Sequence, residues 1–206
     1  MSNSPKTTTV RIFHILIMTF VGVLIGVTAS VVSNLIYLVF LFPIGIGFLG
    51  AMSINKTVKK AKIWKPFQGM LLGTFMALVI YGAYQYSNYL TFRMLLINQM
   101  NLEMMQAIGK MDFEVANVFA DYALKEETGF SGFIGYVLFT AAQGLSVGKI
   151  FSINEINIGS FFTWLYWLAE FGLIAWITSA AGKIAARGHF INSAMLGTEM
   201  KTISES

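Results

Sequence analysis

An uninterrupted stretch of this chain, residues 12–52, contains no Asp, Glu, Lys or Arg. A helix crosses the hydrocarbon core of a bilayer with about 20 residues, at about 1.5 Å of rise per residue. The stretch is about twice that length, so we expect two helices folded back on each other. The small polar clusters at residues 28–30 and 33–34 form the predicted turn. This places the first span at residues 12–28 and the second at residues 35–53.

The remaining sequence predicts two further spans. A third uncharged run covers residues 66–92, and a fourth span covers residues 161–181, with Ser160 as its N-cap and Gly182 as its stop. The chain is 56% hydrophobic and 12% charged, whereas a soluble domain has about 25% charged residues. We therefore expect an all-α integral membrane protein with four transmembrane helices and a helical extracytoplasmic insertion between the third and fourth.

The cations predict the orientation of these spans. Ten of the fourteen Lys and Arg residues lie in the N-terminal tail, the segment before the third span and the C-terminal tail. Cations accumulate on the cytoplasmic side, and four spans put the same three regions on one side by parity. We expect a cell-membrane protein with both termini cytoplasmic, divided into residues 1–11 (tail), 12–92 (three-helix membrane region with a basic cytoplasmic loop at 54–65), 93–159 (extracytoplasmic segment), 160–182 (fourth span) and 183–206 (tail).

The segment between the third and fourth spans contains an ambiguous apolar run, residues 130–153. A fifth span is one interpretation of it, but Gln143, Ser146 and Lys149 dilute the run. A fifth span would also move the cations of the C-terminal tail to the outer side. We favour a helix that lies on or dips into the outer leaflet, or one that packs in a small outer domain.

Two more helices are predicted before this run, and a hairpin after it. The first helix covers residues 94–108. The second is capped by Asp112 and ends at Gly129. Residues 145–158 alternate as a short hairpin would. The spacing i, i+3, i+4, i+7 predicts that the second helix buries an apolar face made of Val115, Val118, Phe119 and Tyr122.

Glu170 is the main candidate for chemistry, because it lies near the middle of the fourth span. An ionised carboxylate at that depth costs about 2.5–3.5 kcal/mol on insertion scales. A proton or cation site, a contact to a charged partner, and a protonated Glu bonded to a neighbouring helix all remain open. We expect Tyr81 or Tyr84 to donate a hydrogen bond to it. We also expect Pro43 to kink the second span beside it and to leave the Val39 carbonyl without a helical partner.

Other residues have more general interpretations. Gly22 with Gly26, and Gly69 with Gly73, have the four-residue spacing that lets membrane helices pack closely. A basic segment beside the third span has the composition of a site for anionic lipid headgroups, but we favour its interpretation as a pure topology signal. Its residues are Lys56, Lys59, Lys60, Lys62, Lys65 and Trp64.

Methionine and histidine are the two residue types that raise the question of metal or proton chemistry. Methionines at residues 94–111 are soft ligands of the kind that Cu(I) accepts, but Met100 and Met104 share a helical face with Ile97, as core residues would. The chain has no cysteine, and we expect neither a metal nor a cofactor. His14 is interpreted as an interfacial histidine rather than as a proton relay to Glu170.

Three classes of function remain, because the sequence contains no catalytic triad, phosphate loop or nucleotide-binding motif. The first is a non-catalytic subunit or scaffold of a membrane assembly, with the bilayer and a membrane-protein partner or a second copy of the chain as its contacts. The second is a small oligomeric transporter of protons or cations that uses Glu170. The third is an enzyme acting on a lipid or quinone. We favour the first, and we expect no nucleic-acid partner.

Overall fold

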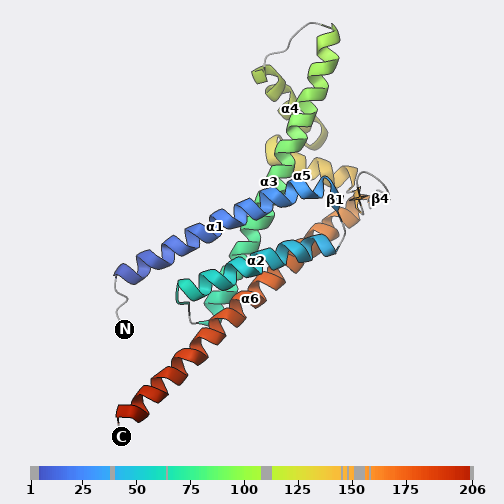
Figure 1. Ribbon diagram of the computed structural model, residues 1–206. Helices are drawn as coiled ribbons and strands as arrows, with labels where there is room; N and C mark the ends of the chain where they lie inside the picture. Colours follow the sequence, from blue (N-terminus) through green and yellow to red (C-terminus); the bar gives the residue numbers. More distant parts are fainter. Residues whose placement is uncertain are drawn as a thin grey trace. The chain divides into compact units, whose positions relative to one another are not determined.

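The structure is a computed structural model that describes residues 5–37, 40–63, 65–107, 113–144, 146–147, 149–150, 156–157 and 159–204 (Figure 1). Four of its helices contain segments long and apolar enough to cross a membrane, so the chain is a helical, multi-pass membrane protein. In chain order the described elements are α1 (Pro5–Ser33), β1 (Ile36–Tyr37), α2 (Leu41–Lys60), α3 (Pro66–Ala107), α4 (Phe113–Thr128), α5 (Gly132–Gln143), β2 (Ser146–Val147), β3 (Lys149–Ile150), β4 (Ile156–Asn157) and α6 (Gly159–Ser204).

The predicted turn between the first two spans is half right. Residues 28–30 remain helical, and α1 continues to Ser33. It ends there because two side chains bind the free carbonyl of Ser30: the Ser33 hydroxyl donates to it at 2.8 Å and the Asn34 amide at 3.1 Å. The second helix therefore begins at Leu41 instead of residue 35.

The third span does not end at Arg93. The helix α3 runs without a break from Pro66 to Ala107, so the predicted span and the predicted helix at 94–108 are one element. The guanidinium of Arg93 donates to Asp121 on α4 at 2.9 Å and to the Tyr89 hydroxyl at 3.1 Å. Arg93 ends the uncharged run of the sequence, but the helix continues past it because Asp121 neutralises its charge.

The helix α6 also continues beyond its predicted limits. Ser160 lies inside the first turn instead of capping it, and the side chain of Asn157 accepts the Gly159 N–H at 2.8 Å. Gly182 does not stop the helix, because its backbone keeps helical geometry and its missing side chain serves packing. The predicted C-terminal tail is helical as far as Ser204.

The described residues between α3 and α6 form two shorter helices, α4 and α5, and three short strands, β2, β3 and β4. The 12 residues of α5 are too few to span a bilayer, and the described residues of 130–153 contain no fifth candidate span. Gly129 ends α4 as predicted, with a φ of 80° that favours glycine, whereas Asp112 lies outside the described residues. In place of a simple hairpin, β2 pairs antiparallel with β4, while β3, which lies between them in the chain, pairs with β1 from the turn after α1.

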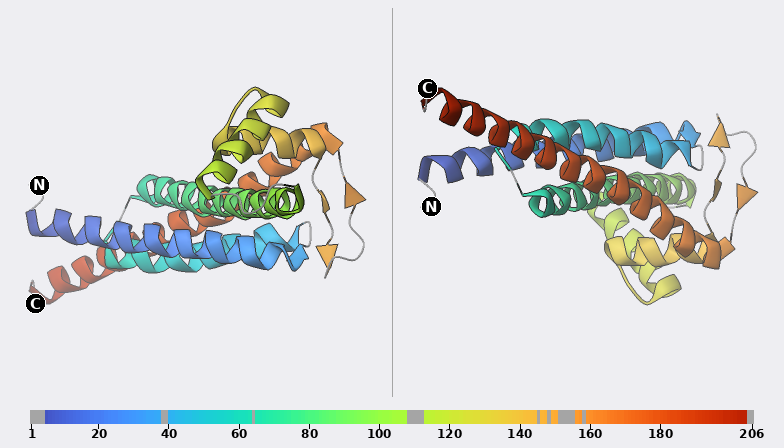
Figure 2. Two further views of the ribbon diagram at one scale, coloured as in Figure 1. Left: turned by 90° about the horizontal axis from the view of Figure 1, so that it is seen from above. Right: turned by 90° about the horizontal axis from the view of Figure 1, so that it is seen from below.

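The chain divides into two compact units. The first contains Met1–Ala29, Val39–Ala83 and Ala169–Ser206, and the second contains Ser30–Leu38 and Tyr84–Leu168. In the first unit α1 and α2 run antiparallel and side by side (Figure 2). The Arg11 side chain near the start of α1 donates to the carbonyl oxygens of Ala61 and Lys62 just after α2, at 3.3 and 3.4 Å.

Glycines set the spacing of the helices in the first unit. A Cβ at Gly69 of α3 would overlap the carbonyl of Gly182 on α6, and a Cβ at Gly182 would overlap the carbonyl of Gly69. One helical turn away, a Cβ at Gly73 would overlap the carbonyl of Thr178. On α2, a Cβ at Gly50 would lie 2.8 Å from the side-chain methyl group of Thr178. The backbones of α3 and α6 are therefore in direct contact, as in other membrane helix pairs with small residues at the interface.

The second unit is held by an aromatic cluster and an ion pair. Tyr89 of α3 and Tyr136 of α5 pack ring to ring at 5.6 Å, against Leu124 of α4. Burial raises the pKa of the Tyr136 phenol above its ordinary value, with a smaller opposing effect from a hydrogen bond to Thr140. Asp121 of α4 is bound to α3 through Arg93.

The predicted buried face of α4 is wrong. Val115, Val118, Phe119 and Tyr122 are exposed, by 44%, 69%, 42% and 60%. The face that packs against Ile97 of α3 consists of small residues, Ala116 and Ala120, both fully buried. The helix approaches α3 closely there because these side chains are short, and the four larger side chains of the predicted face point away.

We predict that Gly73→Ala lowers the free energy of unfolding by about 1–3 kcal/mol, because the new methyl group must push α3 away from α6. Gly82→Ala on the same helix is the matched control, since nothing lies within 4 Å of its Cβ position. We expect it to leave stability unchanged or to raise it by up to about 1 kcal/mol. Denaturant titration of both variants in the same detergent measures the difference, and equal effects would contradict the close approach.

Candidate functional site: the buried Glu170

Glu170 of α6 is buried, with 2% of its surface exposed. The hydroxyl of Tyr81 on α3 donates to its Oε2 at 3.3 Å. The Tyr81 ring packs on the ring of Phe171 at 5.7 Å, which holds the phenol beside the carboxyl group. The structure therefore brings together two of the residues that the sequence selected.

The close contact between α3 and α6 positions this pair. The two helices are antiparallel, since Gly69 meets Gly182, Gly73 meets Thr178, and Tyr81 meets Glu170. From the contact of Gly73 with Thr178, about two turns of each helix lead to Tyr81 and Glu170. Residues on one face recur every three or four positions, so the same interface that brings the glycines together also places the phenol and the carboxyl group face to face.

Pro43 does not kink a span beside Glu170 as the sequence predicted. The helix α2 begins at Leu41, so Pro43 lies in its first turn, where a backbone N–H has no partner within the helix. The carbonyl of Val39 lies outside the described residues. Pro43 is buried, one turn before Gly47, which packs on Ile174 of α6.

Tyr84, the other predicted donor, is buried as well, with 6% of its surface exposed. It belongs to the second unit, whereas Glu170 belongs to the first. A hydrogen bond from Tyr84 to Glu170 stays a prediction.

A second polar pair lies on the interface of α3 and α6. The hydroxyl oxygens of Thr74 and Ser179 are 2.9 Å apart. Between this pair and Glu170, the described residues of the first unit include the buried apolar side chains Ala77 and Ile174. The hydroxyl of Thr178 donates back to the carbonyl of Ile174 at 2.9 Å, so it binds its own helix. The interface thus contains two polar pairs, Thr74 with Ser179 and Tyr81 with Glu170, about two helical turns apart.

The predicted packing glycines are buried, and the structure adds a partner face that the sequence analysis missed. Cβ atoms on Gly22 would lie 2.9 Å from Val79 and 3.0 Å from Met76, and Gly26 is buried. Gly69 and Gly73 pack on α6, as described above. The partner face of α6 repeats a small residue every fourth position, a signal present in the sequence: Thr178, Gly182 and Ala186.

The predicted basic loop is mostly helical. Three of its lysines lie in the last two turns of α2, which extends to residue 60 instead of ending near residue 53. The connection to α3 is therefore short, and it contains Lys62 and Lys65. Trp64 lies outside the described residues. The lysines of α2 are exposed and lie at the end that Arg11 also contacts: Lys56, Lys59 and Lys60.

His14 binds its own helix. Its Nδ1 donates to the carbonyl oxygen of Val10 at 2.8 Å, and its ring packs edge-on against Phe13. Among the described residues, no group of three His, Cys, Asp or Glu side chains is arranged to hold a metal. Met111 and the side chains of Met100 and Met104 lie outside the described part of the chain.

We predict that Tyr81→Phe lowers the free energy of unfolding by about 1–3 kcal/mol, because it removes a donor from a buried carboxyl group. Tyr86→Phe is the control, since Tyr86 is 52% exposed, and we expect a change of less than about 0.5 kcal/mol. Unfolding in detergent is followed by circular dichroism. Equal stability of the two variants would show that the Tyr81 hydroxyl does not support Glu170.

No family model, curated protein or solved structure matches this chain. Its function is therefore inferred from its own residues.

Proposed function

We propose that this multi-pass membrane protein is a non-catalytic subunit or scaffold of a membrane assembly. The observation that carries the proposal is the outward apolar face of α4, made of Val115, Val118, Phe119 and Tyr122. α4 is not among the four candidate spans. Large apolar side chains that are exposed outside the bilayer core mark sites where another molecule binds.

The charges of α4 favour a protein over a lipid surface as its partner. Helices that lie on anionic membranes carry Lys and Arg on their polar side. The described residues of α4 include four acids and one cation: Glu114, Asp121, Glu126, Glu127 and Lys125. Anionic lipid headgroups would repel this composition. We infer that the face binds an apolar helix of a partner membrane protein whose surrounding charges are basic.

The proposed topology has both termini in the cytoplasm of a cell-membrane protein and residues 93–159 on the outer side. Two contacts support this arrangement. Arg11 binds the connection after α2, so the N-terminal end of α1 and the C-terminal end of α2 share a side. The pairing of Ile36 with Ile150 brings the turn after α1 to the segment between α5 and α6. In this topology α4 and its apolar face are extracytoplasmic.

We predict that Val118→Glu weakens the assembly at least about 30-fold, because about 2 kcal/mol or more is lost when a charge enters an apolar interface. Native mass spectrometry of the complex, extracted gently from its own membrane, measures the loss. A photo-crosslinking residue at position 118 should form an adduct with one partner polypeptide at fixed stoichiometry. The same residue at position 127, on the opposite side of α4, should not.

Several outcomes would contradict the subunit proposal. These are a chain that is extracted alone, a complex that survives Val118→Glu unchanged, or crosslinks from position 118 to lipid alone. An adduct with a second copy of this chain would replace the proposed assembly with a homo-oligomer.

Proton or cation transport through Glu170 is a second candidate, and the burial of this ionisable group in a candidate membrane span favours it. The separation of the two polar pairs on the interface of α3 and α6 disfavours it.

We predict that Glu170→Gln keeps the fold, since an amide also accepts the Tyr81 hydrogen bond, and leaves proton and cation flux into liposomes unchanged. Flux is measured with a pH-sensitive dye, and Glu127→Gln on exposed α4 is the control. A wild-type flux that disappears only in Glu170→Gln would make transport the function.

A further inference from the structure

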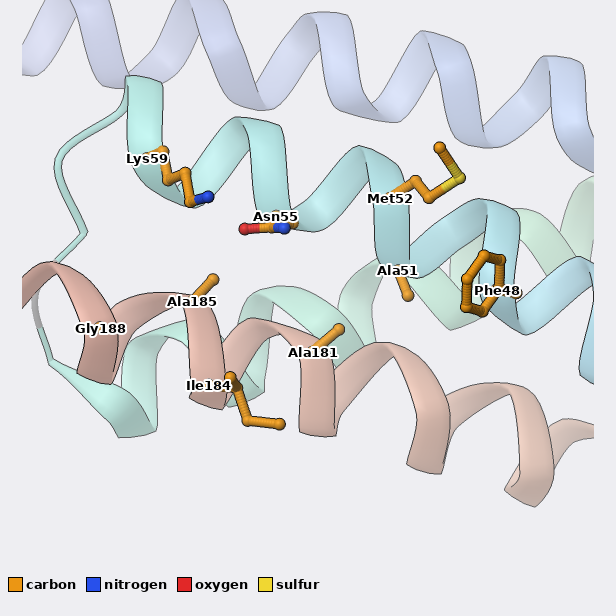
Figure 3. Close-up of a pocket in the computed structure, with 9 residues that line it drawn as sticks. All are labelled: Phe48, Ala51, Met52, Asn55, Lys59, Ala181, Ile184, Ala185 and Gly188. Carbon is orange, nitrogen blue, oxygen red and sulfur yellow. The ribbon is translucent and has the colours of Figure 1, made fainter.

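A groove between α2 and α6 runs along the first unit (Figure 3). Its volume is about 730 Å³, within the range of pockets that hold small ligands. Phe48, Ala51 and Ile184 line its apolar length, and Asn55 and Lys59 lie toward one end of it. Both helices are candidate membrane spans, so hydrocarbon would meet the apolar part of this groove.

A second groove, of about 520 Å³, lies on the other side of α2, between α1 and α2. Its walls include Ile17 and Leu49, and its basic end includes Lys56 and Lys60, with His14 nearby on α1. Among the described residues that line either groove there is no Asp or Glu.

One residue, Met52, lines both grooves. It lies on α2, which is the wall that the two grooves share, and it is half exposed. Lys56 and Lys59 lie one and two turns further along the same helix. Because they are three positions apart, their side chains share a face. Both are exposed, and Lys56 lines one groove while Lys59 lines the other.

We propose that a single anionic phospholipid with two acyl chains straddles α2. One chain lies in each groove, on either side of Met52, and the phosphate binds Lys56 and Lys59. A lipid has two apolar chains that diverge from one anionic group, and this is the arrangement that the two grooves and the two lysines offer. The inference concerns the first unit alone and does not depend on the proposed docking face of α4.

The dimensions of the grooves fit this occupant. From Phe48 to Lys59, α2 rises about 16 Å, at about 1.5 Å per residue. This is about half of the roughly 30 Å hydrocarbon core, which is the depth that one leaflet supplies. The apolar part of each groove therefore lies at the level of acyl chains when Lys56 and Lys59 lie at the headgroups. A groove facing hydrocarbon excludes water, because water there would lose its hydrogen bonds.

Charge favours an anionic headgroup over a neutral one. Lys56, Lys59 and Lys60 lie within about one turn, and Arg11 is held beside the same end of α2 by its bonds to Ala61 and Lys62. Each cation near an anionic membrane surface contributes about a fivefold gain in affinity. The cytoplasmic leaflet, which the proposed topology places at this end, is the anionic one.

The test is native mass spectrometry of the purified full chain in a neutral detergent, titrated with phosphatidylglycerol or with phosphatidylcholine of the same acyl chains. We expect one phosphatidylglycerol to bind at least about tenfold more tightly than phosphatidylcholine. The double variant Lys56→Gln/Lys59→Gln should lose about 25-fold in affinity for phosphatidylglycerol. The control Lys62→Gln/Lys65→Gln removes the same charge from lysines that line neither groove, and it should lose less than about threefold.

A second pair of variants tests the acyl-chain part of the proposal. Ala51→Phe fills the groove between α2 and α6, and it should reduce the affinity for phosphatidylglycerol to that for its one-chain lysolipid. Gly45→Phe is the control, because its Cβ position on α2 is open, and it should leave both affinities unchanged. Circular dichroism establishes that all variants fold.

The proposal is overturned by equal binding of the two lipids, or by equal losses in the two double variants. It is also overturned if Ala51→Phe binds two-chain lipid as well as the wild type does. A polypeptide crosslinked within either groove in native membranes would assign that groove to a protein partner instead. None of these results depends on whether Val118→Glu disrupts an assembly, so the two proposals succeed or fail separately.

Discussion

The contact of Gly69 with Gly182 fixes the arrangement of the first unit. Each residue meets the other's carbonyl where a side chain would stand, so the α3 and α6 backbones touch. Helices within a bilayer gain little from the hydrophobic effect, because lipid is as apolar as they are, and close van der Waals packing must hold them. The same contact determines what lies further along the interface. Thr74 reaches Ser179, and Tyr81 reaches Glu170, only at the spacing that glycine permits. An alanine in place of Gly73 would therefore affect polar pairs that it does not touch.

Small residues also form the contact between two helices in the second unit. Ala116 and Ala120 pack on α3, while Val118 and Phe119 point away. In a soluble domain, water drives the largest apolar side chains inward, and the i, i+3, i+4, i+7 pattern identifies the core. On α4 the same pattern identifies the outer face. The expected face was wrong because it took size as the criterion for burial. The usable signal was the repeat of alanines at every fourth residue, together with the repeat of Thr178, Gly182 and Ala186 on α6.

The sequence predicted the number of apolar helices, the polar partner Tyr81 and the packing glycines, because these depend on hydropathy and helical periodicity alone. It failed at helix ends. Gly182 and Arg93 were read as stops and Pro43 as a kink, since each is typical of such positions in isolation. Tertiary contacts decided otherwise: Gly182 gives close approach, and Arg93 finds Asp121. Pro43 falls in the first turn, where it costs no hydrogen bond, because Ser33 and Asn34 end the preceding helix later than expected.

The placement of polar and apolar groups bears on the choice between transport and assembly. A transport site needs an ionisable group and a route of polar groups by which protons or ions reach it. Glu170 supplies the first, but Ile174 and Ala77 separate it from the other polar pair on its interface, and Tyr81 already binds it. The same features suit a carboxyl group that fixes the register of α3 and α6. If α3 shifted along α6, Glu170 would lose the hydrogen bond from Tyr81, and the glycines of α3 would no longer face the backbone of α6. The groups left for interaction then lie on the outside, as apolar side chains on α4 and as lysines and grooves around α2. These exposed groups are the ones that the proposed partner and the proposed lipid would contact.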